Sequence, residues 1–183
     1  MGELHLVRHG RPLVDAAVPA SRWSLHPDAA PAIGELRASG ALPGHARWFS
    51  SPEPKADETA RLLTDSSVTV YDALGEVARP GWLDDFAARV RRGFADPDVP
   101  AAPGWETYTA ARQRTARAVR KLRESLGGVD VVVVGHGTVL TLLVAELTGA
   151  APDVAAWERL SLPDHCALEA ESSRSGLRSS GAY

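Results

Sequence analysis

The stretch Leu4-His5-Leu6-Val7-Arg8-His9-Gly10 indicates both the fold and a candidate site. It begins as an apolar strand and ends in residues suited to binding an anion. Its aliphatic residues predict a buried strand. Arg8 offers a permanently charged, planar fork of donors for phosphate oxygens, and His9 titrates near neutral pH and can act as nucleophile or base. Gly10 lets the backbone approach a ligand closely. Ligands bind at the carboxyl ends of strands in open α/β sheets, so we expect an anion site here. The alternative is that Arg8 and His9 simply leave the core for solvent.

A second strand of this kind lies far along the chain. The β-branched run Val131-Val132-Val133-Val134 predicts a buried strand. Gly135-His136-Gly137-Thr138 follows it and opens a predicted helix that runs to about Leu147. The free N–H groups and the dipole of that helix point at the turn, which makes the turn an anion site by geometry. We therefore expect the rings of His9 and His136 to be neighbours at the ends of adjacent parallel strands.

The composition indicates one domain spanning residues 1–183. A net charge of −3, from 20 basic and 23 acidic residues, gives no case for nucleic acid or membrane partners. Cys166 has no second cysteine to pair with, which fits a reducing compartment. Met1-Gly2-Glu3 runs directly into the first strand, so no signal peptide is expected and a cytoplasmic location is predicted. The sequence does not define the oligomeric state, and a homodimer is one of the open alternatives.

Strand and helix patterns alternate along the chain, which predicts an α/β fold: a three-layer α/β/α sandwich with a mostly parallel central sheet. After the strand at Leu4, further strands are predicted at 46–50, 68–71, 129–134, 157–162, 166–170 and 177–182, the last after a turn at 172–176. Helices are predicted at 27–39, 51–63, 83–92, 106–126 and 138–147. The stretch 11–25 reads as a loop, and the irregular stretch 79–105 as an insert that covers the substrate.

Four motifs in order resemble the histidine phosphatase superfamily, the phosphoglycerate-mutase-like fold. They are Arg8-His9-Gly10, Ser51-Pro52 with Lys55-Ala56 and Glu58-Thr59-Ala60, Leu74-Gly75-Glu76, and Gly135-His136-Gly137. The resemblance covers nearly the whole chain. It implies a phosphatase that hydrolyses phosphate monoesters through a phosphohistidine on His9. It also implies that the 11–25 loop crosses the mouth of the site.

The resemblance further assigns roles to individual residues. Arg8, Lys55 and His136 are expected to surround the phosphoryl oxygens, and Glu76 to protonate the leaving oxygen and then activate water. A plain surface carboxylate remains an alternative reading of Glu76, and Asp72, Asp84 and Asp85 are other candidate acids. The predicted substrate-binding residues are Lys55, Gly10, Gly137, Thr138, Arg11 and Arg22. Trp23 either lines the site or anchors the loop by packing.

The sequence departs from the family pattern at Lys55, where relatives usually carry arginine. Lysine keeps the charge and loses the bidentate fork. Two alternatives to hydrolysis therefore stay open: mutase-type phosphoryl transfer, and a phospho-ligand binding protein with a weakened site. The expected partner is a small phosphorylated substrate.

No metal and no cofactor is predicted. His5 and His9 are four residues apart on a strand, so they do not form the helical face of a zinc site. Neither a Gly-x-Ser-x-Gly elbow nor a Walker-type Gly-Lys-Ser/Thr motif occurs. The remaining histidines, His26, His45 and His165, are expected to be isolated surface or loop residues. The arginines of the 106–126 helix (Arg112, Arg114, Arg117, Arg120 and Arg123) are expected to form a solvated face.

Overall fold

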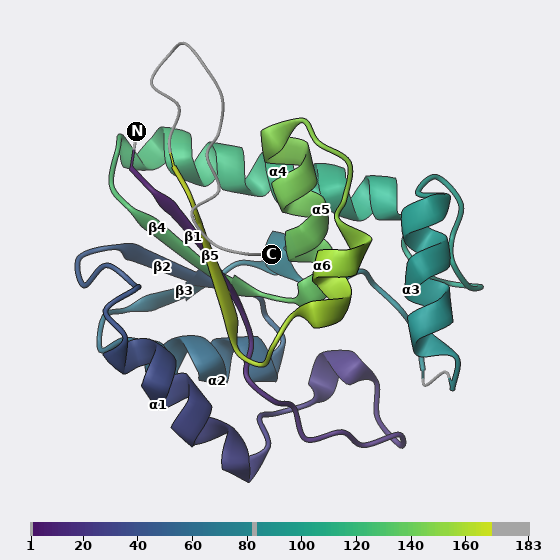
Figure 1. The fold of residues 1–183 in the computed structure, drawn as a ribbon, viewed down its shortest axis with the longest axis horizontal. Helices are drawn as coiled ribbons and strands as arrows, with labels where there is room; N and C mark the ends of the chain where they lie inside the picture. Colours follow the sequence, from purple (N-terminus) through teal and green to yellow (C-terminus); the bar gives the residue numbers. More distant parts are fainter. Residues whose placement is uncertain (1, 82–83, 170–183) are drawn as a thin grey trace.

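The protein is described by a computed structural model over residues 2–81 and 84–169. Its centre is a five-stranded sheet with the order β3-β2-β4-β1-β5 (Figure 1). The strands β3, β2, β4 and β1 run parallel, and β5 pairs antiparallel with β1 at one edge. The strand bounds are β1 Leu4–Arg8, β2 Arg47–Ser50, β3 Val68–Val70, β4 Val131–Gly135 and β5 Asp164–Leu168.

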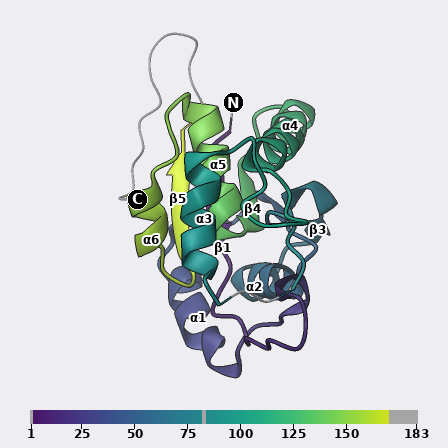
Figure 2. The ribbon, with the colours of Figure 1, turned by 90° about the vertical axis from the view of Figure 1, so that its right-hand side faces the viewer.

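Helices cover both faces of the sheet, which confirms the predicted three-layer α/β/α sandwich (Figures 1 and 2). One face is covered by α1 (Ala30–Ala38) and α2 (Pro54–Leu63), and the other by α4 (Tyr108–Leu126) and α5 (Gly137–Thr148). Beyond these layers lie α3 (Phe86–Ala95) and α6 (Val154–Arg159). Short 3-10 turns occur at Ala20–Arg22, Pro27–Ala29 and Asp72–Leu74.

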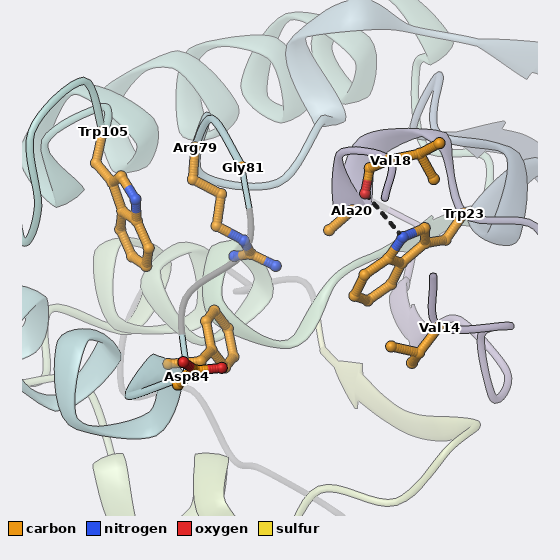
Figure 3. Close-up of a pocket in the computed structure, with 9 residues that line it drawn as sticks. Val14, Val18, Ala20, Trp23, Arg79, Gly81, Asp84 and Trp105 are labelled. Carbon is orange, nitrogen blue, oxygen red and sulfur yellow. Dashed lines mark hydrogen bonds between the residues drawn. The ribbon is translucent and has the colours of Figure 1, made fainter. Parts of the chain in front are cut away.

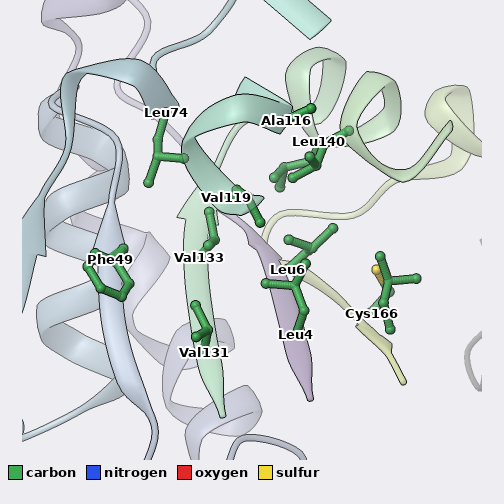
Figure 4. Packing of buried hydrophobic residues seen from close by; sticks show 12 residues of the cluster. Leu4, Leu6, Phe49, Leu74, Ala116, Val119, Val131, Val133, Leu140 and Cys166 are labelled. Carbon is green, nitrogen blue, oxygen red and sulfur yellow. The ribbon is translucent and has the colours of Figure 1, made fainter. Parts of the chain in front are cut away.

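The two core clusters follow from the alternation of side chains along each strand. In β1, Leu4 and Leu6 face α4 and α5, together with Val131 and Val133 of β4 (Figure 4). Val7, Val132 and Val134 occupy the alternate positions of these strands, point the other way and belong to the cluster under α1 and α2. Because the sheet is buried on both faces, its central strands read as continuous apolar runs.

The strand register brings the histidine-bearing turns together. Arg8, the last residue of β1, pairs with Gly135, the last residue of β4. His9 and His136 therefore follow their strands at the same level. The backbone N–H of His9 donates to the carbonyl of Gly135 at 3.0 Å, and that of Ser51, just after β2, donates to Val134 at 2.9 Å. Three parallel strands thus end side by side.

One predicted strand is wrong. Residues 157–162 contain the end of helix α6 and a turn, and Asp153 begins this helix by accepting a hydrogen bond from the N–H of Ala156 at 2.8 Å. Side-chain capping by Asp is a helix signal that outweighs the strand propensity of Trp157. The strand predicted at 166–170 is β5, which begins two residues earlier, at Asp164. The helix predicted at 83–92 is α3, displaced toward the C-terminus. The predicted turn at 172–176 and strand at 177–182 lie outside the described residues.

None of the helices in the described ranges combines the length and apolar character needed to cross a membrane.

Candidate active site

The rings of His9 and His136 are neighbours, as the strand pattern predicts. Their centroids lie 5.1 Å apart with an interplanar angle of 64°. Both side chains are buried. Each histidine follows the last residue of its strand, so adjacent parallel strands hold the pair in place. Two imidazoles this close in a buried setting disfavour charge on each other.

His9 is held with one ring nitrogen available for attack. Its Nδ1 lies 2.7 Å from the carbonyl oxygen of Gly10, so Nδ1–H donates and Nε2 carries the lone pair. The pKa of His9 is held well below its usual value, mainly by burial and then by the neighbouring His136, Lys55 and Arg8, while the bond to Gly10 opposes this shift. Neutral pH therefore leaves His9 uncharged. The N–H of Gly10 donates to the hydroxyl of Thr59 at 2.9 Å, which fixes the peptide that orients the ring.

His136 contributes a second buried imidazole to the same place. Its Nε2 lies 2.7 Å from the hydroxyl oxygen of Ser51, whereas its Nδ1 is buried without a hydrogen-bond partner among the described residues. If the hydroxyl donates to Nε2, the proton of the neutral ring resides on Nδ1. Burial lowers the pKa of His136 well below its usual value, and the cationic side chains of Lys55, Arg79, Arg8 and Arg114 act in the same direction.

Arg8 is anchored at one end of its guanidinium and unpartnered at the other. Nη1 donates to the carbonyl oxygens of Leu160 at 2.7 Å and Ser161 at 3.3 Å. Nε is buried and has no partner within the described residues. A Cβ at Gly137 would lie 3.2 Å from this Nε, so the glycine makes room for the arginine. Burial lowers the pKa of Arg8 from its ordinary value, which still leaves the group charged at neutral pH.

Glu76 lies at the amino end of α5. Its carboxylate accepts hydrogen bonds from the N–H groups of Val77 at 2.9 Å, Val139 at 3.1 Å and Thr138 at 3.4 Å. His136 is the N-cap residue of α5 and supplies no side-chain cap, so Glu76 satisfies the helix from a distant segment. The carboxylate and the helix that follows His136 are therefore joined directly.

Arg114 holds the segment that carries Glu76. Its guanidinium donates to the carbonyls of Ala73 at 2.7 Å, Gly75 at 3.1 Å and Glu76 at 3.2 Å. Its other contacts go to the carboxylate of Glu106, at 2.8 and 3.0 Å. This residue corrects the expectation that the arginines of α4 form only a solvated face. Arg117 and Arg120 are exposed as expected, whereas Arg112, Arg114 and Arg123 are half-buried.

Lys55 forms a buried ion pair. Its ammonium lies 2.5 Å from the carboxylate of Glu53 and donates to the carbonyl of Ala20 at 2.7 Å. The other oxygen of Glu53 accepts the N–H of Glu76 at 2.9 Å and lies 3.5 Å from Nε2 of His136. Lys55 therefore adjoins the two histidines with its charge already partnered.

These side chains surround one pocket of about 140 Å³, which we call the phosphate pocket. Seven predicted site residues line it: Arg8, His9, Lys55, Glu76, His136, Gly137 and Thr138. Three others do not. Arg11 and Arg22 are exposed, and Gly10 packs against α1, since a Cβ there would lie 2.7 Å from the side chain of Ile33. The remaining lining residues are Pro12, Ala20, Trp23, Arg79, Phe86, Trp157 and Leu162.

Sequence reasoning missed four polar residues at or beside this pocket. Arg79 lies three residues beyond Glu76, and a search for basic residues around the candidate acid would have found it. Ser51 and Glu53 stand inside the Ser-Pro motif, but their contacts with His136 and Lys55 depend on the way β2 ends. Arg114 gave no signal, because it is one of many arginines on α4.

Two further expectations concern histidines and metals. His165 is not isolated: its ring stacks on that of His5 across β1 and β5, with centroids 5.4 Å apart and Nε2 3.1 Å from Nδ1 of His5. His165 pairs with Val7, two residues from His5 in β1, so the two histidines are diagonal neighbours on one face of the sheet. Within residues 2–81 and 84–169, no three His, Cys, Asp or Glu side chains are grouped so that they could hold a metal ion.

The sequence profile of the histidine phosphatase superfamily (branch 1) matches residues 4–179. The chain therefore belongs to this superfamily. Among curated protein sequences, none matches the chain significantly.

Solved structures of phosphatases share the fold. A variant of phosphoserine phosphatase from Entamoeba histolytica, in complex with phosphoserine, has a TM-score of 0.74 and 15% identity, over 99% of this chain and 96% of that one. A putative alpha-ribazole-5'-P phosphatase from Escherichia coli gives 0.71 and 22%, over 97% and 95%. A mycobacterial glucosyl-3-phosphoglycerate phosphatase complexed with VO3 gives 0.71 and 24%, over 98% and 97%. These likenesses establish the histidine phosphatase fold and leave the substrate of this chain undefined.

Proposed function

We propose that the protein is a metal-independent phosphatase that hydrolyses small phosphate monoesters through a phosphohistidine on His9. The arrangement around His9 carries this proposal. A neutral imidazole with its Nε2 lone pair available lines one pocket with Arg8 and His136, whose Nε and Nδ1 atoms are buried without hydrogen-bond partners among the described residues. Buried donors normally have partners, and the oxygens of a phosphoryl group would supply them.

The first step transfers the phosphoryl group to the protein. Nε2 of His9 attacks phosphorus, the bond from phosphorus to the ester oxygen breaks, and Glu76 gives its proton to the leaving oxygen. Arg8 and His136 neutralise the charge on the non-bridging oxygens as it moves toward the leaving group. Because Gly10 accepts from Nδ1, the imidazolium that forms on attack remains hydrogen-bonded.

The second step returns the histidine to its starting state. Glu76, now a carboxylate, takes a proton from water while the water oxygen attacks phosphorus. The bond between phosphorus and Nε2 breaks, and inorganic phosphate leaves. One carboxyl group therefore serves first as acid and then as base. The backbone bonds from Val77 and Val139 hold it in one place through both steps.

The proposal is tested by turnover of p-nitrophenyl phosphate in EDTA, with His9→Ala as the matched inactive variant. The parent is expected to release p-nitrophenol without added metal and to retain radiolabelled phosphate after a rapid quench in base. The label should be lost in acid, because phosphohistidine is acid-labile and base-stable. Label that survives acid, or trapping that persists in His9→Ala, would identify another nucleophile.

A phospho-ligand binding protein with a weakened site is the second candidate, and the Lys55–Glu53 ion pair favours it. A carboxylate paired to the cation reduces the positive potential available to a dianion. This alternative predicts that inorganic phosphate or vanadate binds while p-nitrophenyl phosphate is not turned over. Added phosphoglycerate would reveal mutase-type transfer as an isomerised product.

A further inference from the structure

A second pocket adjoins the phosphate pocket. It has a volume of about 290 Å³ and shares Ala20, Trp23, Arg79 and Phe86 with its neighbour. Its remaining lining is Val14, Val18, Gly81, Asp84 and Trp105. We call it the ring-lined pocket. A group esterified to a phosphate bound beside His9 can extend into it without leaving the protein, because four residues line both spaces.

Two walls of different origin form the ring-lined pocket. Figure 3 shows Arg79 and Trp105 on one side, facing Trp23 and Val18 of the 11–25 loop. The indole Nε1 of Trp23 donates to the carbonyls of Asp15 at 2.8 Å and Val18 at 3.2 Å. These bonds fix the ring within its own loop, so the apolar face of the indole is preset for contact with a ligand.

In the opposite wall, the guanidinium of Arg79 stacks against two aromatic rings. The guanidinium carbon of Arg79 lies 4.5 Å from the centroid of Phe86 and 5.8 Å from that of Trp105. The two rings are 6.2 Å apart and tilted by 44°. Cation–π contacts of this kind hold a guanidinium against aromatic surface, so the side chain of Arg79 joins the two rings into one wall.

The charge of the lining argues against an anionic occupant. Arg79 contributes one positive charge and Asp84 one negative charge, and no other residue among the described lining is ionisable. A carboxylate on the leaving group would therefore meet a pocket with no net charge and mostly apolar walls. Val14 and Val18 are 54% and 37% exposed at its rim, which is apolar surface that an apolar ligand would remove from water.

We propose that the ring-lined pocket binds the leaving group of the substrate and that this group is an uncharged aromatic ring. The inference rests on the proposed phosphatase function, because that function places the phosphoryl group in the adjoining pocket. The substrate class is then a phosphate monoester of an alcohol that carries a neutral aromatic ring.

Binding of stable phosphonates to the full chain tests the inference without turnover. 2-Phenylethylphosphonate and ethylphosphonate carry the same anionic head and differ by one phenyl ring, and 2-carboxyethylphosphonate replaces that ring with a carboxylate. Isothermal titration calorimetry should give a Kd about tenfold or more lower for the phenyl compound than for the ethyl compound, as expected for burying an aromatic ring. The carboxyethyl compound should bind no better than the ethyl compound.

Variants of the lining residues test whether the ring-lined pocket causes the preference for the phenyl compound. Val14→Asn/Val18→Asn should lower the phenyl-to-ethyl preference about threefold, and Phe86→Ala should lower it further. Val129→Asn is the matched control: Val129 is 41% exposed and precedes the amino end of β4, away from the carboxyl ends where both pockets lie. This control should keep the preference of the parent.

The outcomes separate the two proposals. Equal affinity for the phenyl and ethyl phosphonates, tighter binding of the carboxyethyl compound, or a preference untouched by the pocket variants would overturn the inference. Hydrolysis of 2-phenylethyl phosphate and ethyl phosphate is followed in parallel, since both are alkyl esters. Turnover without a ring preference would leave the phosphatase proposal standing alone. A ring preference in binding with neither ester nor p-nitrophenyl phosphate hydrolysed would overturn the phosphatase proposal, and the ring-lined pocket would then hold the ring of a bound phosphate ligand and not a leaving group.

Discussion

The ammonium of Lys55 and the carboxylate of Glu53 are 2.5 Å apart, and both residues are buried. The same carboxylate holds the backbone of Glu76. The cation that we expect to contact the phosphate is therefore linked, through one acidic residue, to the position of the proposed general acid.

Lys55→Ala is expected to lower kcat and stability together. Loss of one charge-assisted contact to a transition-state oxygen costs about 10²–10³ in rate. Leaving Glu53 as an unpaired buried charge costs about 3–5 kcal/mol of unfolding free energy. Lys55→Arg, which keeps the charge, should retain activity. Urea denaturation and steady-state kinetics on the same preparations measure the two effects.

A double variant separates these two roles of Lys55. Glu53→Gln/Lys55→Met removes both buried charges together, so that no charge is left unpaired, and keeps an oxygen that can accept the N–H of Glu76. Stability should recover, whereas the rate should stay low. If this variant turns over as fast as the parent, Lys55 is not a phosphate ligand.

Glu76→Gln and Glu76→Ala should differ in stability but not in chemistry. Gln keeps an oxygen that can accept the N–H of Val139, so the amino end of α5 stays capped. Ala removes the cap, which should cost about 0.5–2 kcal/mol. Both variants lose the proton donor, which should reduce turnover of alkyl phosphates by about 10²–10⁴. Thermal denaturation and kinetics distinguish the two effects, and full activity in Glu76→Gln would rule out the acid role.

Arg114 is expected to act as a positioning residue for Glu76. Arg114→Gln breaks the bonds to the carbonyls of residues 73–76, so proton donation by Glu76 should become less effective. Hydrolysis of alkyl phosphates, whose leaving oxygens need a proton, should fall by about tenfold or more, within the range for general acid catalysis. Hydrolysis of p-nitrophenyl phosphate should change far less.

The control for Arg114 is Arg117→Gln, an exposed arginine on the same helix, which should behave as the parent on both esters. An equal loss on the two esters in Arg114→Gln would indicate a purely structural role.

Stability is expected to fall as the pH drops below about 6.5. The pKa values of His9 and His136 are held well below 6.5 in the folded chain. Between those depressed values and 6.5, the unfolded chain binds more protons, so the unfolding free energy rises with pH across this window. Each histidine contributes a slope of up to about 1.4 kcal/mol per pH unit.

Melting temperatures from pH 7.5 to 5.5 measure this dependence. His9→Ala removes one of the two groups and should flatten the slope, whereas Arg117→Gln should keep it. A pH-independent melting temperature in the parent would show that the two histidines do not titrate differently on unfolding.

Residues whose role depends on the sheet could be predicted from the sequence. The apolar runs at β1 and β4 define buried parallel strands, and the residue after each strand must lie at the carboxyl edge. His9, His136 and Gly137 were found on that basis, and motif resemblance added Lys55 and Glu76. The pocket brings these residues together with Arg8 and Thr138.

The other site residues are positioned by contacts between segments that are distant in the sequence. Strand and helix patterns do not encode such contacts. Arg114 reaches the Glu76 segment across 38 residues, and nothing in its spacing on α4 distinguishes it from Arg117. The family resemblance predicts Arg11 and Arg22 at the site because their loop is expected to cross its mouth, but the loop turns Trp23 inward and leaves both arginines exposed. The strand predicted at 157–162 is wrong because Asp153 caps helix α6, and this cap outweighs the local strand propensity.

The carbonyls of Leu160 and Ser161 hold the guanidinium of Arg8, which joins the first motif of the chain to a segment about 150 residues later. Synthesis of the protein therefore completes the surroundings of Arg8 late. A nascent chain that has already made both histidines still lacks the two oxygen atoms that orient Arg8. The shortest fragment able to assemble the site must continue past α6 to include Leu160 and Ser161. Strand β5 follows these residues and pairs with β1. A library of C-terminal deletions would lose phosphate binding abruptly, at the point where this tether is removed.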